Sequence, residues 1–537
     1  MMQTPLLLTQ MIERAEKYFP KKEIVSRTES GIQRFTYKQW GARTRRLASA
    51  LHKLGVREGD KVGTLAWNHH RHLEAYFAIP CSGAVLHTIN IRLSPQHISY
   101  IINHAGDKVL LIDADILPLI EKIKDSIQGV EAFIVMTDGE VPKTSLENVY
   151  HYEELLSNGD PSFSFRTDLD ENAPAGMCYT SATTGNPKGV IYSHRGIVLH
   201  AMALGLADTT GVCEKDTALP VVPMFHVNAW GLPFASVWFG TKQVLPGPYF
   251  TPGILAKLMQ DEKVTITAGV PTIWLGLLNE IEQNEYDLSS LRSILCGGSA
   301  APRGMIKAFE ERFGIPFMHA YGMTETSPLA VIAASKSYHA DLSADEKLDL
   351  KAKQGILVPG LEMKIIGKDG EAAWDGKEMG ELALRGPWIA SEYYQDERSQ
   401  DAFRDGWLYT GDVVTIDEEG YIKIVDRTKD LIKSGGEWIS SVDLENALMA
   451  HEDIFEAAVV AVPHEQWQER PVACVVLKES SQGKVIKEDI LDFLKPQFAK
   501  WWIPDDVLFI NEIPKTSVGK FLKRTLRDQV QDKIKQV

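Results

Sequence analysis

Cysteine is scarce in this sequence. The 537 residues include only five cysteines, scattered along the chain and forming no CxxC pair: Cys81, Cys178, Cys213, Cys296 and Cys474. An odd number of isolated cysteines excludes a disulfide framework as the basis of the fold and argues against a zinc site. We therefore expect a protein of a reducing compartment, most simply the cytoplasm.

Long apolar runs and excess positive charge are also missing. No stretch approaches the ~20 apolar residues that a membrane-spanning helix needs, and residues 1–13 lack the pattern of a secretory leader. The net charge is −15, from 57 basic and 72 acidic residues. A nucleic-acid-binding protein needs a basic face, so we expect no nucleic-acid partner and at most peripheral contact with membranes.

Alternating strand and helix patterns fill the first two thirds of the chain. Short apolar runs at Lys61–Ala66, Lys108–Asp113 and Val264–Gly269 indicate buried strands, whereas Pro95–His104 and Ala301–Phe313 have helical patterns. Strands separated by helices predict sheets with both faces covered, which is an α/β architecture.

The pattern changes near Gly360. Short strands punctuated by Gly and Asp predict a small, largely β subdomain; they are Glu362–Ile366, Gly380–Arg385 and Tyr421–Val425. Beyond Asp426, alternating elements predict a compact α+β unit, with helices at Ser441–His451 and Glu488–Leu494 and strands at Ala457–Val462 and Ala473–Leu477. The charged segment Lys336–Lys353 indicates a helical surface insertion.

One segment has the composition of a phosphate-binding loop. Residues 179–189 read Tyr-Thr-Ser-Ala-Thr-Thr-Gly-Asn-Pro-Lys-Gly, which brings hydroxyl donors, glycines and one lysine close together. The spacing is not that of a Walker motif. On composition alone, a Ser/Thr/Gly-rich surface turn explains the segment equally well.

Four further segments carry candidate chemistry. Glu325 lies among hydroxyl residues in 320–328, Asp412 ends the turn 409–412, a double glycine lies in 426–438, and Lys520 ends the segment 514–520. These side chains suit, respectively, a magnesium ligand, a ribose acceptor, a flexible linker and a substrate-binding cation. Each segment alone is more typical of a solvated turn or linker.

Together, in this order and spacing, the five segments resemble the adenylate-forming superfamily. The likeness covers nearly the whole chain and is greatest to bacterial medium- and long-chain fatty acyl-CoA synthetases, through Val222–Trp230 and Lys433–Ser440. Methylthiopropionate-CoA ligases are similar too and share a stretch like Lys500–Pro504. The resemblance implies a large N-terminal domain (1–425) of two α/β subdomains plus a β-barrel subdomain, a hinge (426–431) and a small α+β C-terminal domain (432–537).

The same resemblance implies a set of site residues. Thr180 and Glu325 would hold Mg²⁺, and Lys520 would bridge the substrate carboxylate and the α-phosphate. The nucleotide would be bound by Thr180, Ser181, Thr183, Thr184, Gly185, Lys188, Gly298, Ala320, Tyr321, Gly322, Thr324, Asp412, Arg427, Lys429, Lys433 and Trp438. Coenzyme A would meet Ser434, Gly435 and Gly436. His226, Trp230 and Phe234 are the candidates for the acyl pocket, with core packing as the open alternative: it is the commoner place for a tryptophan in an apolar run and equally typical of His226.

The implied activity is that of an ATP-dependent, magnesium-requiring acyl-CoA ligase that activates a medium- or long-chain fatty acid, as a homodimer. Three alternatives stay open: a short, sulfur-containing or aromatic acid; transfer to a carrier protein instead of coenzyme A; and a non-catalytic acyl- or nucleotide-binding protein. One departure stands out, since Ala182 occupies a position where this family usually has glycine. A Cβ there adds strain of order 1 kcal/mol if the backbone is left-handed.

Overall fold

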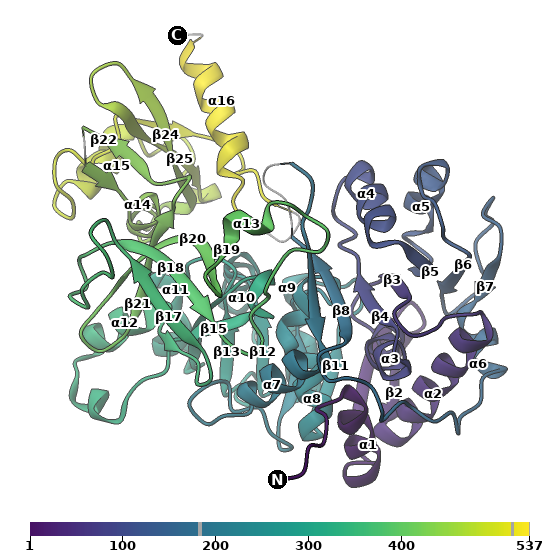
Figure 1. Cartoon of the computed structure of the whole chain (residues 1–537). Coiled ribbons are helices and arrows are strands. Elements are labelled where there is room, and N and C mark those ends of the chain that lie inside the picture. Colours follow the sequence, from purple (N-terminus) through teal and green to yellow (C-terminus); the bar gives the residue numbers. More distant parts are fainter. Residues whose placement is uncertain (181–184, 436, 517–519, 536–537) are drawn as a thin grey trace.

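The computed structural model describes residues 1–180, 185–435, 437–516 and 520–535. Figure 1 shows a large N-terminal part, coloured purple to green, and a small C-terminal domain in yellow-green above it. Three sheets build the large part and a fourth builds the small domain. The expected α/β class with a small C-terminal domain is confirmed.

The first sheet has seven strands in the order β7-β6-β5-β3-β4-β8-β9. All neighbours are parallel except β8 and β9. The strands are β3 (Lys61–Leu65), β4 (Val85–Thr88), β5 (Asp107–Asp113), β6 (Ala132–Met136), β7 (Val149–His151), β8 (Pro174–Tyr179) and β9 (Gly189–Ser193). The connecting helices are α2 (Tyr37–Lys53), α3 (His70–Ala78), α4 (Pro95–Ala105), α5 (Leu117–Ile123) and α6 (Tyr152–Ser157).

Local sequence explains the bounds of these elements. Helix α4 begins at Pro95 because the Ser94 hydroxyl accepts a hydrogen bond from the backbone of the first turn, and it ends at Gly106, whose φ is +71°. The centre of strand β5, Val109–Ile112, is an unbroken apolar run because both faces of a parallel sheet are covered.

The second sheet has nine strands in the order β16-β15-β14-β13-β12-β10-β11-β1-β2. Neighbours are parallel from β14 to β1 and antiparallel at both ends. The strands are β1 (Glu23–Thr28), β2 (Gly31–Thr36), β10 (Thr217–Pro220), β11 (Lys242–Leu245), β12 (Ile266–Gly269), β13 (Ser293–Cys296), β14 (Phe317–Gly322), β15 (Leu329–Ile332) and β16 (Ile356–Leu357). Helices of this half are α1 (Leu8–Tyr18), α7 (His194–Leu204), α8 (Leu232–Phe239), α9 (Pro252–Asp261), α10 (Pro271–Gln283), α11 (Arg303–Lys307) and α12 (Ala344–Ala352).

One buried asparagine joins the two α/β halves. Asn68, which follows β3, donates from its side chain to the carbonyls of Pro220 and Val222, each at 2.9 Å, and accepts from the Met224 backbone at 2.7 Å. Its own carbonyl accepts from the Gly247 backbone at 2.8 Å. A fully buried amide with its polar atoms satisfied is a rigid joint. The joint fixes the loop that follows β10, which leads into the site.

The third sheet is the small β subdomain that the sequence predicts after Gly360. Its antiparallel strands are β17 (Glu362–Ile366), β18 (Gly380–Arg385), β19 (Phe403–Arg404), β20 (Trp407–Ile416) and β21 (Ile422–Arg427), with α13 (Ser399–Ala402) between β18 and β19. In Figure 1 this green sheet lies between the α/β halves and the small domain. Strand β21 therefore ends where the chain passes into the small domain.

The small domain is an α+β unit, as expected. Its sheet contains β22 (Ile432–Ser434), β23 (Glu437–Ile439), β24 (Ile454–His464), β25 (Gln468–Leu477) and β26 (Asp506–Phe509). Its helices are α14 (Ser441–Leu448), α15 (Lys487–Leu494) and α16 (Lys523–Lys535). Among the helices described, none combines the length and the apolar character needed to cross a membrane.

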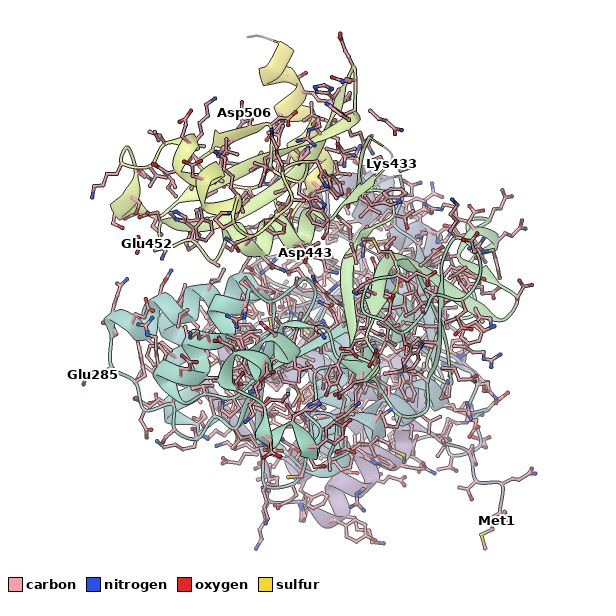
Figure 2. The ribbon with its side chains drawn as sticks, turned by 90° about the vertical axis from the view of Figure 1, so that its left-hand side faces the viewer. Met1, Glu285, Lys433, Asp443, Glu452 and Asp506 are labelled. Atoms are coloured by element: carbon pink, nitrogen blue, oxygen red, sulfur yellow. The ribbon has the colours of Figure 1, made fainter. Side chains whose placement is uncertain are left out.

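Hydrogen bonds at the start of α14 tie the small domain to the end of β21. The backbone N–H of Ser441 donates to the Asp426 carboxylate at 3.0 Å, and the Ser441 hydroxyl donates to the same carboxylate. Lys423 and Asp443 form an ion pair at 2.7 Å across the same junction. Figure 2 shows Asp443 on the side of the small domain that faces the large part. These contacts hold the small domain in one orientation.

Candidate active site

A cavity of about 1060 Å³ lies at the carboxyl ends of the parallel strands in the second sheet. Its wall comes from residues that directly follow or end these strands: Val221 after β10, Val270 after β12, Gly297 after β13 and Tyr321 in β14. Ligand sites of open α/β sheets occur at this edge. Residues of the small domain, including Thr516 and Lys520, complete the wall.

Most of the predicted site residues that the structure describes meet in this cavity. It is lined by Thr180, Lys188, His226, Trp230, Gly298, Ala320, Tyr321, Gly322, Thr324, Glu325, Asp412, Arg427, Lys429 and Lys520. These residues come from all three sheets of the large part and from the small domain. The predicted residues Ser181, Thr183, Thr184 and Gly436, and the unusual Ala182, lie outside the described residues.

Glycine is required at two points of the wall. Gly298 has φ +85°, in the left-handed region that side chains with a Cβ rarely adopt. A Cβ on Gly322 would lie 1.9 Å from the carbonyl oxygen of Pro328. At Gly298 the backbone takes a conformation, and at Gly322 it packs at a distance, that a residue with a Cβ would not allow.

The ends of the phosphate loop are held together by the loop's own residues. The Thr180 backbone N–H donates to the Lys188 carbonyl at 2.9 Å, and the Lys188 N–H donates to the Thr180 hydroxyl at 3.1 Å. Gly185 takes φ +71° and does not line the cavity. Burial lowers the pKa of Lys188, and its ammonium lies 4.0 Å from the centre of the Tyr393 ring. The loop therefore presents one partly desolvated cation to the cavity.

Glu325 is a buried carboxylate on the wall, with only 4% of its surface exposed. The Tyr393 hydroxyl donates to its Oε1 at 2.6 Å. The neighbouring carbonyl, that of Thr324, accepts from the Tyr192 hydroxyl at 2.8 Å. Buried tyrosines thus fix both the side chain and the backbone of this segment.

The donor set fits magnesium bound mainly through a substrate. No group of three His, Cys, Asp or Glu side chains within the described part of the chain is arranged to hold a metal alone. Mg²⁺ prefers oxygen ligands, keeps several waters and is usually bound by one or two carboxylates plus substrate phosphates. The Glu325 carboxylate and the Thr180 hydroxyl, both lining the cavity, supply protein oxygens of this kind.

A second polar cluster surrounds Asp412. The Tyr321 hydroxyl donates to Asp412 Oδ2 at 2.6 Å, and Arg427 Nε lies 3.1 Å from Asp412 Oδ1. The Asp412 charge raises the pKa of Arg427. A carboxylate oriented in this way can accept hydrogen bonds from vicinal hydroxyls, as a ribose would offer.

Lys520 brings a cation from the small domain into the same cavity. Its Cε lies 3.6 Å from where a Cβ on Gly298 would be. Burial, helped by the positive charge of Arg427, lowers the pKa of Lys520 to about 8, although Asp412 and Glu325 act in the opposite sense. Burial likewise lowers the pKa of Lys429, the residue predicted to mark the hinge.

The apolar side of the cavity contains His226 and Trp230 but not Phe234. Burial lowers the pKa of His226 to about 3, so its imidazole is neutral at ordinary pH. Phe234, expected at the acyl group, is instead fully buried in the core and stacks on Tyr76 with 5.1 Å between ring centres. It lies on the side of α8 that faces α3, where its ring contacts Tyr76 and Phe77.

Trp230 is carried by a left-handed turn. Residues 227–230 have φ between +41° and +58°, and Gly231 follows at +74°. Each such non-glycine residue costs roughly 1–2 kcal/mol, so surrounding contacts must hold the turn. A Cβ on Gly231 would lie 2.5 Å from the His200 ring, and the Trp230 ring lies against Gly297. The turn therefore presses one tryptophan against the wall of the cavity.

The residues predicted to bind coenzyme A, or to act in a second orientation of the small domain, lie outside the cavity. Lys433, Ser434, Gly435 and Trp438 belong to the β22–β23 hairpin and do not line the cavity. Lys433 lies over the Trp438 ring at 5.0 Å, and Trp438 is 40% exposed. Figure 2 shows Lys433 on the flank of the small domain, apart from the junction at Asp443.

Sequence reasoning missed the segment that follows β18. Tyr393 contacts Glu325 and Lys188, and Arg398 donates to the carbonyl of Asn186, within the phosphate loop, at 3.1 Å. No glycine pair or hydroxyl cluster marks this segment, so composition offers no signal beyond two adjacent tyrosines.

Known proteins resemble this chain over its full length. A family model described as AMP-binding enzyme matches residues 12–394, and one described as AMP-binding enzyme C-terminal domain matches residues 443–520. A long-chain-fatty-acid–CoA ligase of Thermus thermophilus is 51% identical, over 98% of this chain and 96% of the relative. A 3-methylmercaptopropionyl-CoA ligase of Ruegeria lacuscaerulensis is 44% identical, over 99% and 98% of the two chains.

Solved structures agree with these relatives. An anthranilate CoA ligase in complex with anthranoyl-AMP superimposes with a TM-score of 0.88 at 26% identity, over 99% of both chains. The chain belongs to the AMP-binding enzyme family. Within that family it is an adenylate-forming acyl-CoA ligase, an enzyme whose substrates are a carboxylic acid, ATP and coenzyme A.

Proposed function

We propose that the enzyme activates a medium- or long-chain fatty acid as its acyl-adenylate, with Mg²⁺, and then transfers the acyl group to coenzyme A. One observation carries the proposal: Lys520 of the small domain reaches the cavity that also contains Glu325, Asp412 and Lys188. Cations from two domains thus surround the space in which an acid and a triphosphate would meet.

In the first step the substrate carboxylate attacks the α-phosphorus, a phosphorus–oxygen bond forms, and pyrophosphate leaves. Two anions must approach each other, and preoriented cations in a partly desolvated site reduce their repulsion. Lys520 would meet the carboxylate and the α-phosphate, and Lys188 would hold the leaving pyrophosphate. Thr180 and Glu325 would hold Mg²⁺, which when bound neutralises phosphate charge. Asp412 would accept hydrogen bonds from the ribose.

In the second step the thiol sulfur of coenzyme A attacks the acyl carbon, and AMP leaves. We propose that the small domain first turns about residues 426–431, because its hairpin residues Ser434 and Gly435 do not line the cavity in the present orientation. After the turn the hairpin would present backbone groups to the pantetheine arm, with Lys433 and Trp438 alongside. Turning also withdraws Lys520, so one cavity serves both steps.

The lining of the cavity supports an alkyl chain as the acyl group. Apolar side chains, among them Val222, Val270, Ile273, Leu275 and Leu295, line it together with Trp230. Binding sites for apolar ligands are lined in this way, with few polar groups. The similarity to the Thermus long-chain ligase points in the same direction, whereas the Ruegeria relative favours methylthiopropionate as the second candidate.

Two coupled assays test the proposal. Exchange of labelled pyrophosphate into ATP reports the first step, and coenzyme-A-dependent AMP formation reports the whole reaction, each across saturated acids of increasing length and methylthiopropionate. We expect the highest kcat/KM with a medium- or long-chain acid. A maximum at methylthiopropionate would support the second candidate, and absence of exchange with every acid would overturn an enzymatic role in favour of a binding protein.

We further propose a cytoplasmic homodimer that needs no carrier protein and has no nucleic-acid partner. Similarity over almost the full length of two proteins named as CoA ligases supports coenzyme A, not a carrier protein, as the acceptor. Light scattering coupled to size-exclusion chromatography tests the dimer, and a monomeric mass at micromolar concentration would contradict it.

A further inference from the structure

We propose that Tyr393 is a positioning residue for adenylate formation, whose hydroxyl orients Glu325 and whose ring orients Lys188. This inference rests on the proposed function. It assigns two separable tasks to one side chain, one to its hydroxyl and one to its ring.

The hydroxyl side of the argument is a short buried hydrogen bond. Tyr393 is 4% exposed, and its O–H donates to Glu325 Oε1 at 2.6 Å. A hydrogen bond to an ionised acceptor in a dry site is strong and directional. With Oε1 held, rotation of the carboxylate is restricted, so its other oxygen keeps one direction relative to the cavity. A metal ligand that is oriented in advance needs no rearrangement when Mg·ATP arrives.

The ring side of the argument is a cation–π contact. The Lys188 ammonium lies 4.0 Å from the ring centre of Tyr393, well within the range in which the face of an aromatic ring attracts a cation. Without such a partner, a lysine has four flexible side-chain bonds and many directions. The ring therefore fixes where the cation of the phosphate loop points.

Tyr393 can orient other groups because its own place is fixed. Its N–H donates to the Ser399 hydroxyl at 2.9 Å, and its ring packs edge-on against Phe403 with 5.1 Å between centres. The flanking backbone is tied to both partners of the site: Ala390 N–H donates to the Glu325 carbonyl and Tyr394 N–H donates to the Gly189 carbonyl, each at 2.8 Å. The segment therefore links the Glu325 segment to the end of the phosphate loop.

The consequence is an effect confined to the first half-reaction. Neither Glu325 nor Lys188 is needed once pyrophosphate has left, so Tyr393 should not matter for the attack of the thiol on acyl-AMP. A residue with a merely structural role would impair both half-reactions together. This difference separates positioning from stability.

The test compares three variants of the full-length enzyme. Tyr393→Phe removes the hydroxyl and keeps the ring, and Tyr393→Leu removes both. Tyr394→Phe is the matched control, because Tyr394 packs on His104 with 5.6 Å between ring centres, outside the cavity. For each variant we would measure pyrophosphate exchange, thioester formation from supplied acyl-AMP, and binding of a non-hydrolysable ATP analogue with and without Mg²⁺ by calorimetry.

We expect Tyr393→Phe to lower kcat for exchange by about 10-fold or more, the range for loss of a hydrogen bond to a charged group, and to reduce the gain in analogue affinity that Mg²⁺ provides. Tyr393→Leu should in addition raise KM for ATP and weaken binding without Mg²⁺. Both variants should form thioester from acyl-AMP within about twofold of the wild type, well below the loss expected for exchange.

Three results would overturn the inference: exchange by Tyr393→Phe equal to the wild type, an equal loss in both half-reactions, or the same loss in Tyr394→Phe. If Tyr393→Leu does not fold, the Phe variant decides alone, since it lacks one atom only. Wild-type exchange is measured in parallel, so failure of the proposed function would be seen separately.

Discussion

The lowered pKa of Lys520 predicts a basic limb in the pH profile of adenylate formation. The pKa falls from the ordinary 10.5 to about 8, chiefly because the ammonium is buried, and the nearby charge of Arg427 adds to the effect. A shift of this size corresponds to roughly 3 kcal/mol disfavouring the charged form. Roughly nine-tenths of the free enzyme is protonated at pH 7 and only about one-tenth at pH 9.

The sign of the effect follows from the proposed role. The protonated form neutralises the approaching anions, so kcat/KM for pyrophosphate exchange should be highest near pH 7 and fall about tenfold per pH unit well above pH 8. The substrate carboxyl and the triphosphate are ionised above pH 7 and contribute no basic limb. Bound anions favour the ammonium, so the limb in kcat should lie at higher pH than the limb in kcat/KM.

Lys520→Arg assigns the limb. An arginine stays charged up to about pH 12, so the variant should lose activity at pH 7 through altered geometry but should no longer show a limb near pH 8. Lys515→Arg is the matched control, because Lys515 forms an ion pair with Glu456 at 2.8 Å and does not line the cavity. A wild-type profile that stays flat to pH 10, or a limb that persists in Lys520→Arg, would refute the reasoning.

Three further substitutions test other parts of the site. Asp412→Asn removes a charged acceptor, and we expect AMP affinity, measured by calorimetry, to fall about tenfold or more; unchanged affinity would contradict a ribose contact. Gly231→Ala should lower the free energy of unfolding by more than the roughly 1–2 kcal/mol of backbone strain, because the new Cβ also meets the His200 ring. Gly406→Ala is the control: Gly406 has φ +76° and open space around it, so the variant should lose only the strain energy. Urea denaturation compares the two variants, and equal losses would count against the packing argument. Ser441→Ala removes a hydroxyl donor to Asp426 and so weakens the junction that holds the small domain with Lys520 in the cavity. It should slow pyrophosphate exchange about tenfold and leave thioester formation from acyl-AMP unchanged. Equal slowing of both reactions would argue against a junction that favours the orientation for adenylate formation.

Much of the fold could be predicted from local pattern. Strands β17 and β18 have the predicted bounds, and α4 and β5 differ from prediction by one residue at one end, because alternating burial and capping residues are local properties. The predicted helix 301–313 is shorter at its start, and its second half, Ala308–Arg312, is π-helical. Pairing between distant strands was not predictable: β1 joins β11, more than two hundred residues away.

The site residues likewise divide into those that a local motif marks and those that only distant contacts place. Glu325, Asp412 and Lys520 stand in the motifs that the sequence singles out, and they meet in the cavity. In the sequence, Phe234 has the apolar surroundings expected of either a core residue or a cavity residue. Its place in the core depends on the packing of α8 against α3, which the neighbouring residues in the sequence do not reveal. Tyr393 acts through contacts with residues more than sixty positions away, and no local pattern marks such a role.

The position of the β22–β23 hairpin has a consequence for kinetic order. Gly435 packs against Trp467 on the outside of the small domain while Lys520 of the same domain is inside the cavity. If the small domain turns as one body, as proposed above, it brings Lys520 and the hairpin to the cavity in succession, so the thiol would react after pyrophosphate has left. Double-reciprocal plots of the initial rate with ATP and coenzyme A as the varied substrates should then show the parallel lines of a ping-pong scheme. The rotation rate of the small domain would set the upper limit of kcat.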